Sequence, residues 1–313
     1  MSTFYLDRSG SEISLESDVL VVRHREGRQA VPLALLERLV ISAKTGLDTL
    51  LLGRLAERGV TVLLLDPRRL SRRAQVLGTG HNDVRVRLAQ YRAAEDEAIR
   101  LLRAKGWIQA KVRRHRRLLA EIAGNRPDLR PSLDPIVRRL ASLAQQVVAA
   151  DSLPTLRGLE GSASQVFFGA YRTLFAPSLA FSGRQRRPPP DPVNATLSLA
   201  YTLLHARAVQ TAWASGLDPQ VGFYHHPAWG RESLACDLIE PWRPAVDGWV
   251  YEWFRDRRLR ADHFKYRGGG CFLDKAGRNR FFAAFEQNIT PLQRALRRQC
   301  RELVRYLNAW EES

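Results

Sequence analysis

The sequence lacks the features that mark secreted, disulfide-braced and membrane proteins. It has only 3 cysteines in 313 residues, Cys236, Cys271 and Cys300, and no two of them form a Cys-x-x-Cys pair. A structural zinc site and a disulfide framework are therefore not expected, and we predict free thiols. The first residues show no signal-peptide pattern, and no apolar run reaches the roughly 18 residues that span a bilayer. The expected location is the cytoplasm.

Lysine is also scarce, although the chain is strongly basic. Lys and Arg together number 49 against 32 Asp and Glu, a net charge of +17, and the only lysines are Lys44, Lys105, Lys111, Lys265 and Lys275. A positive field of this size favours a polyanion such as DNA or RNA. An anionic membrane is the rival partner, but no basic stretch carries the clean apolar face that membrane binding needs. We therefore expect a nucleic-acid partner and no membrane.

The first 80 residues have the pattern of a small sheet or sandwich with one helix. Short apolar or alternating runs are separated by Ser-Gly-Ser and Glu-Gly turn signals, as is typical of strands. A helix is expected at residues 47–57, ended by Gly59. Strands are expected at residues 4–6, 19–23, 29–33, 39–42 and 60–65. We predict a β-rich N-terminal domain at residues 1–80.

After Gly78-Thr79-Gly80 the composition changes and helical periodicity dominates. Asn82 or Asp83 is placed to cap the first of these helices, and a hydrophobic content of 45% is enough for a substantial core. Helices are expected at residues 83–104, 107–122, 133–149, 153–175, 193–214, 249–260, 272–290 and 291–310. The predicted fold class is therefore α+β, with the small β-rich domain followed by a larger all-helical C-terminal domain at residues 81–313.

Residues 222–244 hold the strongest local signal for chemistry. A short helix is expected at residues 233–240 with Ser233 as its cap, and Asp237 and Glu240 then share one face. Apolar neighbours indicate partial burial, and buried carboxylates need a cation. A metal such as Mg²⁺, Mn²⁺ or Zn²⁺, with His225 as a further ligand, is one interpretation. The other is a structural ion network in which Arg231 and Arg243 pair with the carboxylates, and His225 and His226 are ordinary loop residues.

Three basic segments are candidate phosphate contacts. Residues 67–73 carry several arginines and could equally form a solvated edge. The helical run 111–117 adds to the overall positive charge, which favours phosphate contact over a solvated face. Arg184, Arg186 and Arg187 precede a proline run that favours an extended, stiff conformation. This third segment is either a linker or a basic loop beside the active site.

In combination these pieces resemble the first core Cas protein, the integrase of CRISPR adaptation that is often called an endonuclease. The order and spacing of the motifs agree with that family over most of residues 150–290, and the N-terminal part is similar more weakly, through its strand order and residues 60–66. The motifs are Arg157-Gly158-Leu159-Glu160-Gly161, Pro188-Pro189-Pro190-Asp191-Pro192-Val193-Asn194-Ala195, Gly222-Phe223-Tyr224-His225 and Gly230-Arg231-Glu232-Ser233-Leu234-Ala235-Cys236-Asp237-Leu238-Ile239-Glu240.

The resemblance implies a metal site made by Glu160, His225 and Glu240, which would also be the catalytic residues, with Asp237 as a supporting carboxylate. Some branches of the family have Asp where this chain has Glu240. His225 is preferred to His226 because it holds the family's Gly-x-x-His position. The implied cofactor is Mg²⁺ or Mn²⁺, since two carboxylates and one imidazole suit either ion.

The resemblance further implies a reaction and a set of partners. The 3′-hydroxyl of a foreign DNA fragment would attack a phosphodiester at the CRISPR repeat boundary, and water as the nucleophile would give endonuclease activity. Double-stranded DNA, as spacer fragment and as repeat, would contact Arg184, Arg186, Arg187, Arg231 and Arg243. The protein would form a homodimer through its N-terminal domains, and two dimers would flank a small ferredoxin-like second core Cas protein. The alternatives are a basic nucleic-acid-binding scaffold without chemistry and an RNA-processing nuclease.

Overall fold

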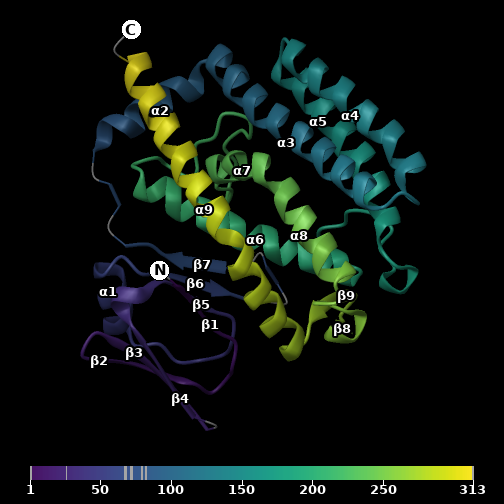
Figure 1. Cartoon of the computed structure of the whole chain (residues 1–313). Helices are drawn as coiled ribbons and strands as arrows, with labels where there is room; N and C mark the ends of the chain where they lie inside the picture. The colour runs from purple at the N-terminus through teal and green to yellow at the C-terminus, as the bar shows by residue number, and fades with distance from the viewer. Residues whose placement is uncertain are drawn as a thin grey trace. The chain divides into compact units, whose positions relative to one another are not determined.

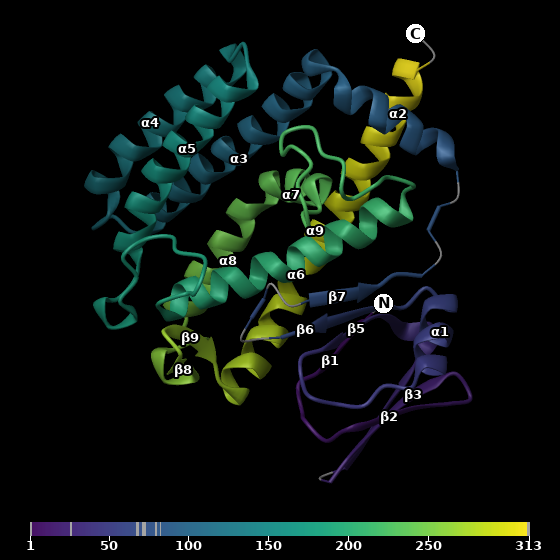
Figure 2. The same ribbon diagram turned by 180° about the vertical axis from the view of Figure 1, so that it is seen from behind.

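The chain folds into two units, which are described separately below. The computed structural model describes residues 2–25, 27–66, 69–70, 73–78, 80–81 and 83–311 (Figures 1 and 2). The units comprise Met1–Asn82 and Asp83–Ser313. Four residues of the basic segment 67–73, Arg68 and Arg72 among them, lie outside the described residues.

The first unit contains two sheets, as the pattern of short runs indicates. One has the strand order β1-β5-β6-β7, in which β1, β5 and β6 are parallel and β7 is antiparallel to β6. The other is the antiparallel meander β2-β3-β4. The strands are β1 (Ser2–Leu6), β2 (Glu12–Glu16), β3 (Val19–His24), β4 (Gly27–Pro32), β5 (Leu36–Ile41), β6 (Thr61–Leu65) and β7 (Arg73–Val76).

A single helix, α1 (Thr49–Glu57), completes the first unit. Asp48 caps it by accepting a hydrogen bond from the Leu50 backbone N–H at 2.9 Å. Gly59 follows the helix with φ +72°, a left-handed conformation that glycine adopts without steric cost. Leu55 of the helix and Leu39 of β5 are fully buried in one apolar cluster, which joins the helix to the sheets. The β-rich N-terminal prediction is therefore confirmed.

The second unit is mostly helical. Its helices are α2 (Val84–Glu95), α3 (Glu97–Asn125), α4 (Arg130–Ala149), α5 (Leu153–Tyr171), α6 (Pro192–Ala214), α7 (Ser233–Ile239), α8 (Arg243–Arg255) and α9 (Lys275–Glu311). Helix α6 is buried along almost its whole length and contacts α7, α8 and α9. It therefore forms the centre of this unit, with α7, α8 and α9 packed against it (Figure 1).

The predicted fold class is confirmed, and several local predictions need correction. The helix expected at residues 249–260 is α8, which begins at Arg243 and ends at Arg255. The chain breaks between α2 and α3 at Asp96, not near residue 105, because the Asp96 carboxylate accepts a hydrogen bond from Ile99 N–H and starts the next helix. The two helices expected at residues 272–310 are one continuous helix, α9, with Pro291 inside it. Helix α7 begins at Ser233 with Glu232 at the N-cap position, and the Glu232 side chain makes no capping hydrogen bond.

The C-terminal unit is not all-helical, because it carries a small hairpin of β8 (Phe264–Arg267) and β9 (Gly270–Leu273). Its two-residue turn has positive φ at Gly268 and at Gly269, +55° and +76°. Such turns match the twist of a hairpin and require residues that tolerate positive φ. Among the described residues, no helix is long and apolar enough to cross a membrane.

Candidate active site

The predicted site segment is organised around one buried carboxylate, that of Asp237 on α7. Its Oδ2 accepts hydrogen bonds from the backbone N–H groups of Phe223 at 2.7 Å and Tyr224 at 2.9 Å. Its Oδ1 is 3.0 Å from the backbone nitrogen of His225 and 2.6 Å from that residue's Nδ1. Asp237 is fully buried. Residues 223–225, which end at the predicted catalytic residue His225, are therefore wrapped around the Asp237 side chain.

Gly222 makes this wrapping possible. A Cβ at this position would lie 2.7 Å from Asp237 Oδ2 and 2.8 Å from the backbone carbon of Ser233. Both distances are shorter than real contacts of a Cβ atom, so any side chain would push the loop away from α7. The glycine is needed here for close approach.

The bond to Asp237 determines which nitrogen of His225 is available. Burial raises the pKa of Asp237, and the hydrogen bonds from His225 and the neighbouring backbone counter that effect. With Nδ1–H donating to the carboxylate, the lone pair of the His225 ring is on Nε2, as in histidines that bind metals. By contrast, His226 is exposed, and its Nδ1 donates to the Pro227 carbonyl at 2.9 Å. Of the two histidines, only His225 is oriented by a carboxylate.

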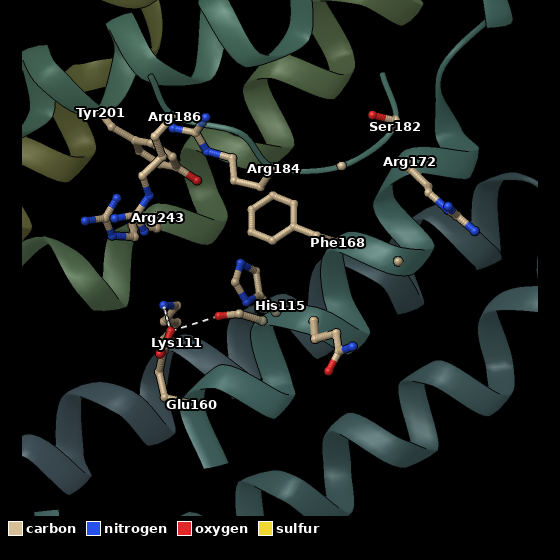
Figure 3. A pocket seen from close by; sticks show the side chains of 14 residues that line it. Lys111, His115, Glu160, Phe168, Arg172, Ser182, Arg184, Arg186, Tyr201 and Arg243 are labelled. Carbon is tan, nitrogen blue, oxygen red and sulfur yellow. Dashed lines mark hydrogen bonds and ion pairs between the residues drawn. The ribbon is translucent and has the colours of Figure 1, made fainter. Parts of the chain in front are cut away.

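Glu160 and Glu240 come together across three elements of the second unit. Glu160 lies on α5, and Glu240 begins the 3₁₀ turn Glu240–Trp242 that follows α7. Between them lies the ammonium of Lys111 on α3, with Nζ 2.5 Å from Glu160 Oε1 and 2.7 Å from Glu240 Oε2. Figure 3 shows Lys111 and Glu160 facing each other. One cation thus bridges the two predicted metal ligands.

A second cation completes this ionic cluster. Arg243 Nε donates to Glu240 Oε1 at 2.7 Å, and its guanidinium lies over the Tyr201 ring. Burial would raise the pKa of Glu240, but Arg243 and Lys111 outweigh it and hold that pKa well below the usual range. Burial alone would lower the pKa of Lys111, but Glu240 and Glu160 outweigh it, and the pKa is raised above its usual value. Glu240, Lys111 and Arg243 are therefore charged at neutral pH.

The site residues expected from the sequence lie in two adjoining groups. His225 with Asp237 forms one, and Glu160 with Glu240 forms the other. Tyr224 is the residue before His225. Its pKa is raised chiefly by burial, and the charges of Glu160 and Glu240 raise it further. His225 in turn contributes to the lowered pKa of Glu240. Among the described residues, however, no three His, Cys, Asp or Glu side chains are close enough together to hold a metal ion.

Two carboxylates and one imidazole are nevertheless ligand types that suit Mg²⁺ or Mn²⁺, and the Lys111 ammonium lies between the two glutamates. Both interpretations of this segment thus have a counterpart in the structure. Arg243 pairs with Glu240, as the ion-network interpretation predicts, whereas Asp237 pairs with His225 instead of an arginine. Lys111 is the residue that sequence reasoning missed. It was grouped with its arginine neighbours as a phosphate contact, and its rarity as a lysine was the available signal.

A basic cavity of about 450 Å³ opens beside the cluster (Figure 3). It is lined by five cationic side chains and one carboxylate, that of Glu160, with Phe168 and Tyr201 providing aromatic surface. The cations are Lys111, Arg172, Arg184, Arg186 and Arg243. The His115 imidazole also lines the cavity, held by a hydrogen bond of 2.9 Å between its Nε2 and Asp247 Oδ2. Such a cavity favours an anion.

The segment that supplies Arg184 and Arg186 is fixed by Asn194 of α6. The Asn194 side-chain oxygen accepts from Arg184 Nη1 at 2.9 Å and from the Gln185 backbone N–H at 2.8 Å. Its amide nitrogen donates to the Gly183 carbonyl at 2.8 Å and to Asp191 Oδ2 at 2.7 Å. At the far end of the segment, Cys271 N–H donates to the Pro189 carbonyl at 2.7 Å. Of the two interpretations of this segment, these bonds favour the basic loop over the linker.

The predicted DNA-contacting arginines differ in their surroundings. Arg184 is engaged with Asn194, and burial lowers its pKa. Arg186 lines the cavity, whereas Arg187 is exposed and outside that lining. Arg231 is exposed on the loop between His225 and α7.

That loop also presents a tryptophan to solvent. Arg231 N–H donates to the Ala228 carbonyl at 3.0 Å and closes a turn in which Gly230 has φ +66°. Trp229 lies at the tip of this turn with a relative exposure of 104%. An indole held in the open beside a candidate active site is suited to stacking on a flat partner.

The fold and sequence are similar to those of known proteins. A structure described as a casposase bound to integration product has a TM-score of 0.87 and 23% identity, covering 100% of this chain and 92% of that one. A CAS1 protein from Thermotoga maritima has a TM-score of 0.83 and 19% identity, with coverage of 98% and 97%. A chain of a Cas6-RT-Cas1–Cas2 complex has a TM-score of 0.83 and 21% identity, and this chain covers 35% of it. At these identities the likeness shows the fold.

Sequence comparison gives the family. A CRISPR-associated endonuclease Cas1 of Thermodesulfovibrio yellowstonii is 38% identical over 292 residues, which cover 92% of this chain and 91% of that relative. A second one, from Rhodospirillum rubrum, is 35% identical over 288 residues, which cover 87% of this chain and 81% of the relative. Residues 4–287 match the family described as CRISPR associated protein Cas1. The chain therefore belongs to the Cas1 family.

Proposed function

We propose that the protein is a metal-dependent DNA endonuclease and integrase of CRISPR adaptation, which inserts foreign DNA into an array by 3′-hydroxyl transesterification. One observation carries the proposal: the partly exposed carboxylate of Glu160 lines a cavity rich in arginines and shares Lys111 with the buried carboxylate of Glu240, while the His225 imidazole is oriented by Asp237. The names of the relatives, endonucleases of the same family, support the proposed reaction class.

Glu160, Glu240 and the Nε2 of His225 would hold Mg²⁺ or Mn²⁺. A bound divalent ion polarises a phosphodiester and lowers the pKa of the attacking hydroxyl. Asp237 keeps the His225 ring in the tautomer that leaves Nε2 free, and it fixes the ring's orientation through the loop it binds. Arg243 holds the Glu240 carboxylate and places a positive charge next to it.

The cavity would bind the DNA backbone next to this centre. Arg172 and Arg186 can each contact two phosphate oxygens, because a guanidinium presents paired N–H donors. Positive charge fixed beside the reacting phosphate stabilises the charge that develops on it during displacement. With a DNA 3′-hydroxyl as the nucleophile the same arrangement joins strands, and with water it cuts them. Integration and endonuclease activity are therefore two outcomes of one proposed site.

The partners we propose are double-stranded DNA, a second copy of this chain and a small ferredoxin-like Cas protein. The similar solved structures are titled as a casposase with an integration product and as a Cas1–Cas2 complex, which is consistent with DNA and a Cas2-like subunit. Dimerisation through the N-terminal unit follows from the family resemblance.

The test is integration of a short duplex into a supercoiled array plasmid, with Mn²⁺ or with EDTA. Glu160→Gln and His225→Ala should abolish strand joining and cutting, because each removes a metal ligand, while duplex binding persists through the arginines. His226→Ala is the matched control and should stay active, since the His226 ring bonds to the Pro227 carbonyl and is exposed.

Unchanged integration by both Glu160→Gln and His225→Ala would contradict the enzyme proposal and leave the basic scaffold in its place. Inactivity of His226→Ala alone would move the ligand assignment by one residue. A strong preference for RNA substrates in the cutting assay would instead favour the RNA-processing alternative.

A further inference from the structure

Lys111 is an unusual residue to serve as a buried cation in this chain. The basic residues are almost all arginines, yet this lysine is the one whose Nζ contacts both glutamates of the candidate site. Its side chain is only 9% exposed. A desolvated ammonium is retained only where anions pair with it, so its present position depends on Glu160 and Glu240.

The ammonium bridges the two carboxylates that would hold an ion in the proposed site. Its nitrogen lies 2.5 Å from Glu160 Oε1 and 2.7 Å from Glu240 Oε2. Oxygen ligands surround Mg²⁺ at about 2.0–2.1 Å and larger divalent ions at about 2.3–2.6 Å. A metal and this ammonium cannot both occupy the space between the same two carboxylates, because they would overlap and repel each other.

We propose that Lys111 is a positioning residue that competes with the divalent ion: it holds the two glutamates in the metal-free protein and must withdraw before a metal binds. The inference rests on the proposed metal-dependent function and specifies how that site is loaded. The lysine stem is flexible and Lys111 lines the basic cavity, so Nζ can move toward the cavity by changing rotamer.

The withdrawn ammonium needs a new anion. Arg172, Arg184, Arg186 and Arg243 also line the cavity, so in the free protein they repel it there. A DNA phosphate in the cavity would reverse this situation by giving the ammonium a partner. Metal binding and DNA binding should then strengthen each other, because each favours the same withdrawn position of Lys111. The site would remain weakly loaded until its substrate is present.

The experiment is a Mn²⁺ titration of the full chain, with free Mn²⁺ followed by electron paramagnetic resonance, without and with a short DNA duplex. Lys111→Met removes the charge but keeps the length, and Lys111→Gln keeps a hydrogen-bond donor. Lys105→Met is the matched control, since Lys105 lies on the same helix about 9 Å along its axis. Circular dichroism and melting with EDTA confirm that each variant is folded.

Both Lys111 variants should bind Mn²⁺ at least about tenfold more tightly than the unaltered chain, as expected when a unit charge is removed from beside an ion. Their melting temperatures should be lower with EDTA and should rise more on adding Mn²⁺, because the ion then replaces the missing cation. DNA should tighten Mn²⁺ binding by the unaltered chain and by Lys105→Met, and should do so much less in the two Lys111 variants.

Unchanged or weaker Mn²⁺ binding in both Lys111 variants would overturn the proposal. Glu160→Gln separates this failure from that of the proposed function. If Glu160→Gln loses Mn²⁺ binding while the Lys111 variants bind as the unaltered chain does, the metal site stands and the competition is refuted. If Glu160→Gln binds Mn²⁺ normally, the metal site itself is misassigned and the competition fails with it.

Discussion

Replacing Asp237 by Asn tests the whole arrangement around His225, because it removes a charge while keeping the shape. Each oxygen of the native carboxylate accepts two hydrogen bonds, three of them from backbone N–H groups and one from His225 Nδ1. An asparagine has a single oxygen, so its NH₂ group must face two donors whichever way the amide is turned. We expect the loop, and with it the histidine, to lose its fixed position.

The magnitude follows from the number of bonds. Hydrogen bonds to a charged group contribute about 1.5–3 kcal/mol each, so losing two costs about 3–6 kcal/mol. Part of this is offset because the variant no longer buries a charge, the effect that raises the pKa of Asp237. We expect the free energy of unfolding to fall by about 2–4 kcal/mol. An amide NH₂ facing Nδ1 also favours the tautomer with the proton on Nε2, which should weaken metal binding or activity about 10–100-fold.

Urea unfolding in EDTA measures the stability, and nitrogen NMR of the His225 ring reports the tautomer. Asp256→Asn is the control, since Asp256 pairs with Arg255 at a side-chain exposure of 38% and 45% respectively. Its loss should cost less than about 1 kcal/mol. If Asp237→Asn proves as stable as this control and His225 keeps its proton on Nδ1, the reasoning about the buried carboxylate is refuted.

Three further outcomes are expected. Gly222→Ala should lower the free energy of unfolding in urea by about 1–3 kcal/mol, because the added Cβ meets backbone atoms. Gly158→Ala has open space around it and should raise the free energy of unfolding by up to about 1 kcal/mol, because Gly158 lies in a helix. Equal effects of the two substitutions would contradict the packing argument. Duplex affinity should fall with salt, the slope of log K against log salt changing by about −0.9 per neutralised phosphate, and a flat response would remove the electrostatic account. Trp229→Ala should weaken the binding of a frayed-end duplex, measured by fluorescence anisotropy, by about 1–3 kcal/mol, and should leave the stability in urea unchanged. A loss of fold stability in this variant would disprove the stacking role of Trp229.

Local periodicity was enough to predict the β-rich start, most helices and the helical spacing of Asp237 and Glu240. It could not predict what those two carboxylates face. Asp237 is bound by its own preceding loop, whereas Glu240 reaches a lysine on α3 that is distant in the chain. Contacts of that range depend on how the helices pack, which no spacing rule describes.

The errors in element boundaries have a similar cause. The break at Asp96 depends on one side chain, that of Asp96, which caps α3. The helical spacing of apolar residues continues across the break, so periodicity alone does not reveal it. The hairpin β8–β9 has strands of 4 residues each, too short for alternation to be recognised. Whether Glu160, His225 and Glu240 bind a metal stays a prediction, since it concerns an ion and a movement of Lys111 rather than the folded chain alone.

The hydrogen bonds of Asn194 have a consequence for the entropy of DNA binding. An arginine-rich loop that moves freely must be ordered when it grips a polyanion, and each immobilised side chain costs about 0.5–1.5 kcal/mol. Here Asn194, itself fully buried, has already fixed Gly183, Arg184 and Gln185 during folding. The entropy cost of ordering this loop is thus met during folding. Binding of the DNA backbone beside Arg186 therefore keeps more of its favourable free energy. Preordered spacing also selects: strands whose phosphates match the fixed cations bind, and others gain nothing from flexibility.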